Sequence, residues 1–487
     1  MCLISVFALP AMADDVVQKD GTIASVEYVE REMQPLLNDG TALERAKTVV
    51  VTDTSTNDGN VISNVTATGD AEVTLEKMSE LKNVTVAGAG AVDLTGVGSV
   101  NSVDASANAG GVTVDLSGAD EAVFKGGTGK DSITVDGSKA AHDLGAGDDT
   151  LTFNGALGEK GTVEGGEGTD TISVAAAKLS DLAAEFKNGD ITGFEVLSVS
   201  DSLSVGIDMA NFAGIDHLTL AGVSAAVTVS NMQSGSTLEL GTGNYAGVIT
   251  VGVDGAAAGQ DGVLNIELTH GTPPTSAKVT VQDVETINIV SDGEGEKYNM
   301  TLTADKATTV KVSGDAELDL TLTGNKIDTI DAVGNSGGVE IVSALNDGAT
   351  FTGGTGADTV TLGKSNTVFG GEGADTFKVS NTKVNELSEI KDFGVGDTIS
   401  MGTFSVSLGK ALVSVDSNAN LANYVELATQ VGGVAWFQYA GDTYVVGNDK
   451  TVGFDATNDF IVKLSGTDID LTGASFVAGS MTLSEGA

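Results

Sequence analysis

The amino-acid sequence predicts an all-β fold, a parallel β-roll or β-solenoid in which short strands form rungs that stack on one another. Three observations lead to this prediction. Many short segments alternate apolar and small polar residues, related segments recur about every 19–21 residues, and a glycine–aspartate motif recurs at the length of one coil. The composition agrees, because the chain has 65 glycines for tight corners and a hydrophobic fraction of 41%, enough for a core.

The strand-like segments are rich in Val and Thr and are punctuated by Gly, Asp and Asn, which is typical of short strands joined by turns. Val65, Val84 and Val103 lie 19 residues apart (84 − 65 and 103 − 84), and Val310 and Ile330 lie 20 apart (330 − 310). A rung of this length cannot bury its apolar face alone and has to stack on its neighbours. An array of β-sandwich domains with similar strand lengths is the structural alternative.

A helical segment is predicted near the N-terminus, in contrast to the rest of the chain. Val26, Val29, Met33 and Leu37 fall at helical spacing within residues 22–46, so we expect one or two short helices there. A helix outside the stacked rungs would be free to make contacts elsewhere. This segment is therefore a candidate for anchoring the protein or for contact between subunits.

Residues 1–13 allow two interpretations. They end in an Ala-Met-Ala cleavage pattern but lack the positive charges of a signal peptide, so they are either a cleaved signal or a mis-assigned start, with translation beginning at Met12. No apolar run approaches the roughly 20 residues of a transmembrane helix. The organisation predicted for the remainder is a helical segment 14–48, β-solenoid rungs 49–125, a first glycine–aspartate roll 126–174, a β-rich middle region 175–350, a second roll with its cap 351–400, and a C-terminal β module 401–487.

A nonapeptide pattern, G-G-x-G-x-D-x-U-x with U an apolar residue, occurs five times: GGTGKDSIT (126–134), LGAGDDTLT (144–152), GGEGTDTIS (165–173), GGTGADTVT (353–361) and GGEGADTFK (370–378). This is the calcium-binding repeat of parallel β-rolls. Glycine permits the tight turn and exposes carbonyl oxygens, and aspartate supplies the hard oxygen ligand that Ca²⁺ prefers. The predicted metal-site residues are Gly126, Gly127, Gly129, Asp131, Gly145, Gly147, Asp149, Gly165, Gly166, Gly168, Asp170, Gly353, Gly354, Gly356, Asp358, Gly370, Gly371, Gly373 and Asp375.

The spacing of the motifs predicts how they stack. Two nonapeptides make one coil of about 18 residues, and the motifs start 18 (144 − 126), 21 (165 − 144) and 17 (370 − 353) residues apart. Asp131, Asp149 and Asp170 should therefore line one edge, and Asp358 and Asp375 another, with each ion held by carboxylates and backbone carbonyls of adjacent corners. The residues at the U position are expected in the core: Ile133, Leu151, Ile172, Val360 and Phe377.

The opposite corners lack the Gly-Gly-Asp order. Their sequences are VDGSKAAHD in the first roll and LGKSNTVF in the second. Because these corners lack that order, we expect calcium on one edge only.

The charge balance restricts the partners. Asp and Glu number 68 against 24 Lys and Arg, a formal net charge of −44. Nucleic acids and anionic membrane surfaces are therefore excluded as partners, whereas divalent cations are natural counter-ions. Cys2 is the single cysteine, so no disulfide framework exists.

The nonapeptides resemble those of the repeats-in-toxin (RTX) proteins, which are exported by type I secretion. In ELSEIKDFGVGDTISM, the residues Ile390, Asp392, Phe393 and Asp397 resemble the strand pair that caps RTX rolls, and the C-terminal segment from Trp436 onward is similar to the C-terminal module of secreted S-layer proteins and adhesins of this family. The resemblance implies an uncleaved C-terminal secretion signal. Such export needs no N-terminal signal, which agrees with a start at Met12.

No pattern of an enzyme is present. The three histidines, His142, His217 and His270, lie in no H-E-x-x-H motif, and no G-x-S-x-G elbow occurs. We expect His142 and His270 in loops and His217 on a strand face. Trp436, the single tryptophan, is expected in the core of the C-terminal module. A β-helix polysaccharide-degrading enzyme is the least favoured alternative, since paired carboxylates are abundant in any acidic chain.

The function expected from the sequence is that of an extracellular, calcium-dependent structural protein of the cell surface, an S-layer subunit. Its expected cofactor is Ca²⁺, and its expected partners are further copies of itself and a cell-surface polysaccharide. The alternative is a calcium-stabilised surface adhesin or biofilm-matrix protein that binds a target and does not tile.

Overall fold

The structure is a computed structural model. It describes residues 83–96, 100–256, 262–268, 277–324, 326–379, 383–402, 411–412, 419–430, 433–448, 453–455, 457–466, 469–477 and 479–484, together with strands at 4–5, 25–31, 46–53, 62–68 and 72–76. The chain forms two compact units. Unit 1 comprises residues 1–201 and 208–219, and unit 2 comprises residues 202–207 and 220–487.

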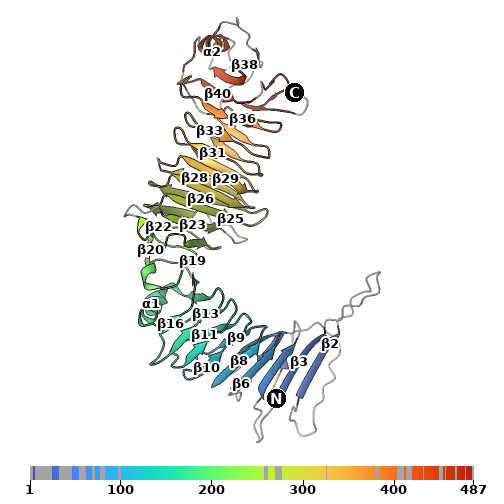
Figure 1. The fold of residues 1–487 in the computed structure, drawn as a ribbon, viewed down its shortest axis with the longest axis vertical. Helices are drawn as coiled ribbons and strands as arrows, with labels where there is room; N and C mark the ends of the chain where they lie inside the picture. The colour runs from blue at the N-terminus through green and yellow to red at the C-terminus, as the bar shows by residue number, and fades with distance from the viewer. Residues whose placement is uncertain are drawn as a thin grey trace. The chain divides into compact units, whose positions relative to one another are not determined.

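Each unit is a parallel β-solenoid, as the sequence predicts. Within the stacked coils the chain passes alternately through two sheets, and the strands pair in parallel with those one coil before and after (Figure 1). The exceptions are the antiparallel strands near the two ends of the chain, such as β2 (Ser25–Arg31) with β3 (Ala46–Asp53) and β38 (Gly433–Tyr439) with β39 (Asp442–Asn448). The sandwich alternative is wrong, because sandwich sheets are antiparallel whereas the rungs here stack in parallel. The corners between the two sheets fall on two opposite edges of every coil.

Unit 1 contains the first three glycine–aspartate motifs. One of its sheets contains β2 (Ser25–Arg31), β3 (Ala46–Asp53), β4 (Ile62–Thr68), β6 (Asn83–Gly88), β8 (Ser102–Asn108), β10 (Val123–Lys125), β12 (Ala141–Asp143), β14 (Thr162–Glu164) and β16 (Ile191–Thr192). The other sheet contains β1 (Ile4–Ser5), β5 (Glu72–Glu76), β7 (Ala91–Gly96), β9 (Val112–Asp115), β11 (Ser132–Val135), β13 (Thr150–Phe153), β15 (Thr171–Val174) and β17 (Val196–Val199).

The strand register of unit 1 stacks like residues in the core. Ile133, Leu151, Ile172 and Leu197 pair in successive coils, and each is 0% exposed. Full burial of such a side chain contributes about 1.5–3 kcal/mol of hydrophobic free energy. The core placement predicted for the apolar position of each motif is therefore confirmed in this unit.

The 19-residue spacing holds for only part of the chain. Val84 pairs with Val103, as predicted. Val65, however, pairs with Val86 and not with Val84. The prediction is wrong here because this coil is 21 residues long (86 − 65).

The helix predicted over residues 22–46 is wrong where the structure describes it. Residues 25–31 form β2, which pairs antiparallel with β3 along its whole length. The segment SVEYVER is rich in β-branched and aromatic residues, and cross-strand pairing overrides its weak helical spacing. Residues 32–45 lie outside the described part, so the anchoring role suggested for this segment stays untested.

Unit 2 contains the last two motifs. One of its sheets contains β21 (Thr237–Leu240), β23 (Val263–Leu268), β25 (Thr286–Ser291), β27 (Thr309–Gly314), β29 (Thr329–Asn335), β31 (Thr350–Thr352), β33 (Thr367–Phe369), β35 (Ser388–Ile390), β37 (Ala411–Leu412), β38 (Gly433–Tyr439), β39 (Asp442–Asn448) and β40 (Phe460–Leu464). The other contains β20 (Val227–Met232), β22 (Val248–Val253), β24 (Ala277–Gln282), β26 (Lys297–Ala304), β28 (Glu317–Thr323), β30 (Val339–Ala344), β32 (Thr359–Thr361), β34 (Thr376–Lys378), β36 (Thr398–Ser400), β41 (Ser475–Val477) and β42 (Ser480–Thr482). Two strands, β18 (Ile207–Asp208) and β19 (His217–Leu220), contain residues of both units.

The core of unit 2 follows the same rule. Val310 pairs with Ile330, as their spacing predicts. Val360 and Phe377 pair in successive coils and are each 1% exposed, so their predicted core placement is confirmed.

Short helices interrupt the solenoid at positions that the strand pattern did not predict. In unit 1, η1 (Ala176–Lys178) and α1 (Leu179–Asn188) follow β15, and η2 (Met209–Asn211) follows β18. Helix α1 buries Leu182 and Phe186, and Phe186 packs edge-on against Phe212 with ring centroids 5.5 Å apart. The helix ends at Gly189, whose φ of 81° is the left-handed conformation that favours glycine.

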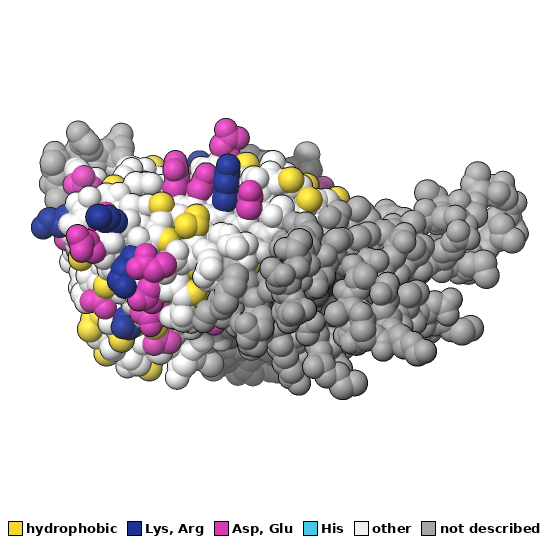
Figure 2. Space-filling view, turned by 90° about the horizontal axis from the view of Figure 1, so that it is seen from below, with side chains coloured by type: hydrophobic (Ala, Val, Ile, Leu, Met, Phe, Trp, Pro, Cys, Tyr) yellow, Lys and Arg dark blue, Asp and Glu magenta, His cyan; other side chains and the backbone are white. Residues whose placement is uncertain are grey.

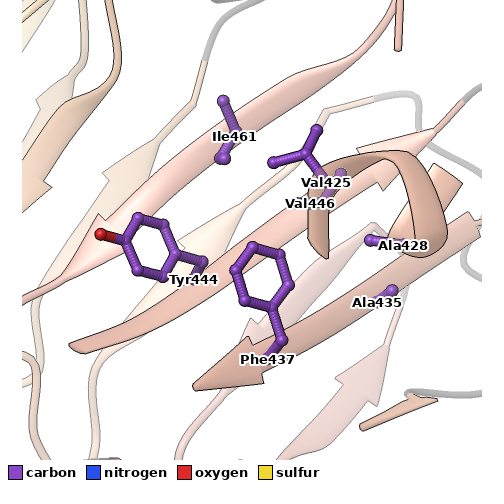
Figure 3. Packing of buried hydrophobic residues seen from close by; sticks show 7 residues of the cluster. All are labelled: Val425, Ala428, Ala435, Phe437, Tyr444, Val446 and Ile461. Carbon is purple, nitrogen blue, oxygen red and sulfur yellow. The ribbon is translucent and has the colours of Figure 1, made fainter. Parts of the chain in front are cut away.

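The C-terminal module of unit 2 has a core of its own. Helix α2 (Leu421–Thr429) packs on β38 and β39, and the core cluster shown in Figure 3 includes a stacked pair, Phe437 and Tyr444, with ring centroids 5.2 Å apart. Trp436 is 3% exposed, so its predicted burial is confirmed. Strand β40 pairs in parallel with β35, which joins the module to the solenoid. In the described part of the chain no helix has the length and apolar character needed to cross a membrane.

Candidate metal centres

The five motifs form corners that stack as the spacing predicts. In unit 1 the three corners follow β10, β12 and β14, which belong to one sheet, and lead into β11, β13 and β15, which belong to the other sheet. All three corners therefore cross between the two sheets in the same direction. In unit 2 the corners begin after β31 and β33 and lead into β32 and β34. The structure therefore brings the first three motifs together on one edge of unit 1 and the other two on one edge of unit 2.

Glycine is required in these corners because successive coils touch through their backbones. A Cβ atom on Gly126 would lie 1.7 Å from the carbonyl oxygen of Leu144 in the next coil. A Cβ on Gly166 would lie 1.8 Å from the carbonyl oxygen of Gly145, and Gly166 also has a φ of 121°, which side chains rarely adopt. Any larger residue would separate the coils.

The five corners have two backbone conformations. In corners 144–149, 165–170 and 370–375 the middle glycines have positive φ, namely Gly145, Gly147, Gly166, Gly168, Gly371 and Gly373. In corners 126–131 and 353–358, which come first in each unit, none of the glycines has positive φ. The same sequence motif therefore gives two structures, depending on whether another motif precedes it.

The aspartates of unit 1 form a hydrogen-bonded chain that we call the first carboxylate ladder. The backbone N–H of Asp131 donates to Asp149 Oδ1 at 2.7 Å, and the N–H of Asp149 donates to Asp170 Oδ1 at 2.8 Å. The ladder continues in both directions, since the N–H of Val112 donates to Asp131 Oδ1 at 2.6 Å and the N–H of Asp170 donates to Glu195 Oε2 at 2.9 Å. Each carboxylate thus binds the backbone of the coil before it.

Unit 2 contains a second carboxylate ladder with the same bonds. The N–H of Val339 donates to Asp358 Oδ1 at 2.7 Å, that of Asp358 to Asp375 Oδ1 at 2.8 Å, and that of Asp375 to Asp397 Oδ1 at 3.0 Å. Asp392 lies beside its end and accepts the N–H groups of Gly370 and Gly371 at 2.8 and 2.9 Å. The segment predicted to cap the roll forms β35 and β36, which add one more coil by pairing in parallel with β33 and β34, and its Asp397 extends the ladder.

The ladder carboxylates are buried, and three of them are incompletely bonded. Asp131, Asp149, Asp170, Asp358 and Asp375 are at most 2% exposed. The second oxygens of Asp131 and Asp358 accept N–H groups of their own corners, from Gly127 at 3.1 Å and Gly354 at 2.9 Å. The Oδ2 atoms of Asp149, Asp170 and Asp375 are buried without any hydrogen-bond partner. An unpaired buried charge of this kind costs several kcal/mol of folding free energy.

The pKa values reflect this burial. Burial raises the pKa of Asp149 and Asp375 to about 7, and neighbouring carboxylates add to the rise. Burial also raises the pKa of Asp131 and Asp358, to about 6, although their N–H bonds oppose it. A proton or a cation at the open oxygens would each relieve the repulsion, and at neutral pH a cation is the stronger counter-charge.

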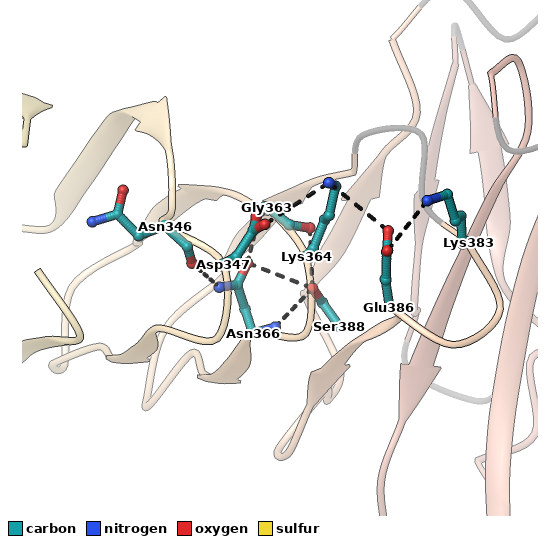
Figure 4. Close-up of polar contacts among 8 residues, drawn as sticks. All are labelled: Asn346, Asp347, Gly363, Lys364, Asn366, Lys383, Glu386 and Ser388. Atoms are coloured by element: carbon teal, nitrogen blue, oxygen red, sulfur yellow. Dashed lines mark hydrogen bonds and ion pairs between the residues drawn. The ribbon is translucent and has the colours of Figure 1, made fainter. Parts of the chain in front are cut away.

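The opposite edge of unit 2 contains a hydrogen-bonded network of neutral side chains, with charged side chains beside it (Figure 4). Asn366 Oδ1 accepts the N–H of Gly363 at 2.7 Å, and Asn366 Nδ2 donates to the carbonyl oxygens of Asn346 and Ala349 at 2.6 and 3.2 Å. The backbone N–H of Asn366 donates to Ser388 Oγ of the next coil at 3.1 Å. Lys364 lies outside this network, 3.8 Å from both Asp347 and Glu386.

The opposite edge of unit 1 contains His142, for which the sequence prediction is wrong. His142 lies in strand β12, is 2% exposed, and its Nε2 is 2.7 Å from Ser138 Oγ. Burial lowers its pKa to about 4, so it is neutral at neutral pH. Residues 141–143 alternate between exposed and buried positions, as strand residues do, and the histidine takes the buried position. The strand is only three residues long, so its pattern resembles that of a turn. His217 lies on strand β19, as predicted, and His270 lies outside the described residues.

The ladders fit a cation that accepts mixed oxygen ligands. Among the described residues no three His, Cys, Asp or Glu side chains converge as a metal-binding group. A cation at these corners would therefore be held by carboxylates together with backbone carbonyls. The unbonded Oδ2 atoms are open to such a cation, and backbone carbonyls of adjacent corners lie close by and would supply further oxygens. Ca²⁺ accepts such irregular sets of six to eight oxygens.

Several ladder residues escaped the sequence prediction. Glu195 and Asp397 extend the ladders, and Asn108 and Asn335 start them by bonding the N–H groups of Gly111 and Gly338, each at 2.7 Å. A sequence motif shared by the two rolls could have identified the two asparagines. The sequence N-x-G-G-V occurs at 108–112 and 335–339, in both cases 23 residues before the first ladder aspartate (131 − 108 and 358 − 335).

A scan against protein-family models finds no match to this chain, and a search of curated proteins finds none either. The fold defines the class of protein: a parallel β-solenoid whose coils are joined at one edge by buried carboxylates.

Proposed function

We propose that this chain is a secreted, calcium-dependent structural protein that self-assembles into a bacterial surface layer. The observation that carries the proposal is that three of the five motif aspartates, Asp149, Asp170 and Asp375, each have a buried carboxylate oxygen without a hydrogen-bond partner. They lie in glycine corners of the pattern that binds calcium in β-rolls. A calcium ion at these corners would coordinate the unbonded oxygens and neutralise their buried negative charge.

Calcium binding would couple folding to export. Where Ca²⁺ is scarce, the ionised ladders repel and weaken the solenoid, which suits a chain that has to pass through a secretion channel. Where Ca²⁺ is abundant, binding contributes to the free energy of folding, because the complete site exists only in the folded chain. The resemblance to RTX proteins supports type I export as the route, with the signal in the C-terminal module.

Self-assembly would follow from the same charge. Figure 2 shows one face of the molecule, on which Asp and Glu side chains lie among Lys or Arg side chains and scattered hydrophobic ones in the described part. The formal net charge of −44 keeps free copies apart. Divalent cations would reduce this repulsion, and identical copies could then tile through contacts that do not close into a ring.

Electron microscopy of the purified protein with and without Ca²⁺ tests the assembly. We expect ordered sheets on addition of Ca²⁺ and their loss in a chelator. A variant with Asp358→Ala and Asp375→Ala should bind less calcium and assemble poorly, whereas Glu372→Gln, in an exposed position of the same corner, serves as the matched control. Monomers at all calcium concentrations, together with unchanged calcium affinity in the double variant, would overturn the proposal.

An adhesin is the second candidate, favoured by a polar hollow in unit 2. The hollow has a volume of about 300 Å³ and lies over β26, β28 and β30, with Asn299, Thr301, Asp319, Thr321 and Glu340 in its lining. Amide, hydroxyl and carboxylate groups of this kind hydrogen-bond the hydroxyls of a polysaccharide. Retention of the calcium-loaded protein on a surface polysaccharide, without sheet formation and lost in Asp319→Ala, would favour this candidate over the array.

A further inference from the structure

The fourth coil of the first ladder has no glycine–aspartate motif, yet it places a carboxylate in the same position. Ser132, Thr150, Thr171 and Val196 pair in register at the start of four successive strands. The residues directly before them are Asp131, Asp149, Asp170 and Glu195. Glu195 therefore occupies the aspartate position of a coil whose corner reads Thr-Gly-Phe-Glu.

Glu195 also makes the bond that defines the ladder. Its Oε2 accepts the N–H of Asp170 at 2.9 Å, as Asp170 Oδ1 accepts the N–H of Asp149 at 2.8 Å. The carbonyl oxygen of Asp170 in turn accepts the N–H of Glu195 at 3.1 Å. The two carboxylates are thus fixed in adjacent coils on the same edge.

The space between these two coils contains an oxygen that lacks a partner. Asp170 is 0% exposed, and its Oδ2 has no hydrogen bond. The carbonyl oxygen of Gly193 lies near it, since both oxygens flank Gly165: a Cβ placed on Gly165 would be 1.9 Å from Gly193 O and 2.7 Å from Asp170 Oδ2.

The charges around this space are all negative. Burial raises the pKa of Asp170, and the negative charges of Glu195 and Asp148 raise it further. In the part of the chain that the structure describes, no Lys or Arg forms an ion pair with Asp170, Glu195 or Asp148. The position therefore combines neighbouring oxygens with uncompensated negative charge.

We propose that Glu195 completes a calcium site between the third and fourth coils of unit 1, together with Asp170 and the carbonyl oxygen of Gly193. The inference rests on the proposed calcium function and extends it beyond the glycine–aspartate motifs. Glu195 is half-buried at the edge of the solenoid, so water supplies the remaining ligands. Ca²⁺ tolerates such a mixed, irregular set, whereas Mg²⁺ requires near-octahedral geometry.

The test is the number of Ca²⁺ ions bound per full-length chain, measured by flow dialysis, in the unsubstituted protein, Glu195→Gln and Glu167→Gln. Glutamine keeps an oxygen for the N–H of Asp170 but removes the charge, so the ladder bond survives. Glu167 is an exposed residue of the neighbouring corner and serves as the matched control. We expect Glu195→Gln to bind one ion fewer and Glu167→Gln to bind the full number.

The outcomes separate this inference from the proposed function. If the unsubstituted protein binds no calcium, both fail. If it binds calcium and Glu195→Gln binds the same number with the same affinity, only the Glu195 site is wrong. Thermal unfolding of Glu195→Gln distinguishes a folding defect from the loss of a calcium ligand. If its melting temperature falls equally in chelator and in calcium, Glu195 has a purely structural role and the inference is overturned. A loss confined to calcium would support it.

Discussion

The two edges of the unit 2 solenoid perform the same structural task with different chemistry. Asn366 on one edge and Asp375 on the other each accept a backbone N–H and connect successive coils. The asparagine also donates, to two carbonyl oxygens, so its polar groups are satisfied within the protein. The aspartate has no donor, and its Oδ2 is left without a partner. The amide of Asn366, on what we call the amide edge, is therefore satisfied within the protein, whereas the carboxylate of Asp375, on the carboxylate edge, has one oxygen that no protein group bonds.

The largest effect is expected from placing a carboxylate on the amide edge. Asn366→Asp would direct a negative oxygen at the carbonyls of Asn346 and Ala349, where the amide now donates. We expect a loss of about 3–5 kcal/mol in the free energy of unfolding, the usual consequence of an uncompensated buried charge. Urea unfolding in chelator at pH 7.5 measures it.

Asn366→Ala is the control, because it removes the same hydrogen bonds without adding a charge. Its expected loss is about 1–3 kcal/mol. Equal losses in the two variants would mean that charge is not what distinguishes the edges.

The reverse substitution, Asp375→Asn, places an amide on the carboxylate edge. It should change the free energy of unfolding in chelator by less than Asn366→Asp does, and it should not lower it. The amide retains the bond to Asp358 N–H and removes the buried charge, so stability in chelator should be unchanged or higher. The gain in stability on adding calcium should shrink, by about 2.7 kcal/mol per lost site at 100 times the dissociation constant. Thermal unfolding with and without Ca²⁺ checks both parts. An unaltered calcium response would exclude Asp375 as a ligand.

The pH dependence in chelator sharpens the comparison further. Asp149 and Asp375 have pKa values of about 7 in the folded protein and near the ordinary 3.8 when unfolded. Between about pH 4 and pH 7 the folded chain therefore binds more protons, and stability should fall as pH rises through this window. Urea midpoints from pH 4.5 to 8 measure the slope.

The double variant Asp149→Asn, Asp375→Asn removes the two ladder carboxylates whose pKa values rise to about 7, so its slope should be smaller. The slope that remains in it reports the other ladder carboxylates, such as Asp131 and Asp358, together with the net charge of the whole chain. An identical slope in both proteins would contradict the assignment. Saturating Ca²⁺ should remove most of the slope, since the cation keeps the carboxylates ionised.

The smallest effect is expected at the surface of the amide edge. Lys364 is 46% exposed and lies 3.8 Å from its two acidic partners. Such pairs are screened by solvent, so Lys364→Ala should change the free energy of unfolding by less than about 1 kcal/mol in urea titration. A larger loss would show that the amide edge depends on charge after all.

The sequence was sufficient for the architecture because the architecture is repetitive. Residues such as Ile133 and Leu151 recur at one position of a constant motif, and constant spacing implies stacking. Local departures were harder to predict. Leu179, Leu182 and Phe186 followed by Gly189 have the spacing and the terminal glycine of a short helix, but the signal is brief within a strand-rich chain.

The hydrogen bonding of the site was beyond sequence reasoning for a different reason. The motif identifies Asp131 and Asp149 as equivalent, yet Asp131 uses both oxygens for N–H groups whereas Asp149 leaves one unbonded. The extra bond of Asp131 comes from Gly127 in its own corner, and it accompanies the different glycine conformation of that corner, which the shared motif does not reveal. Glu195 was missed because it lies at the right register in a corner without the motif.

The direction of the ladder bonds gives the solenoid a polarity. In every step the acceptor belongs to the coil that follows in the chain: Asp149 accepts the N–H of Asp131, and Asp170 accepts the N–H of Asp149. A partly wound ladder therefore ends in a backbone N–H whose acceptor has not yet arrived, and this end is always the C-terminal one. Coils that wind on from the C-terminal end find each acceptor already in place, whereas coils that wind on from the N-terminal end leave one ladder N–H unbonded at every step.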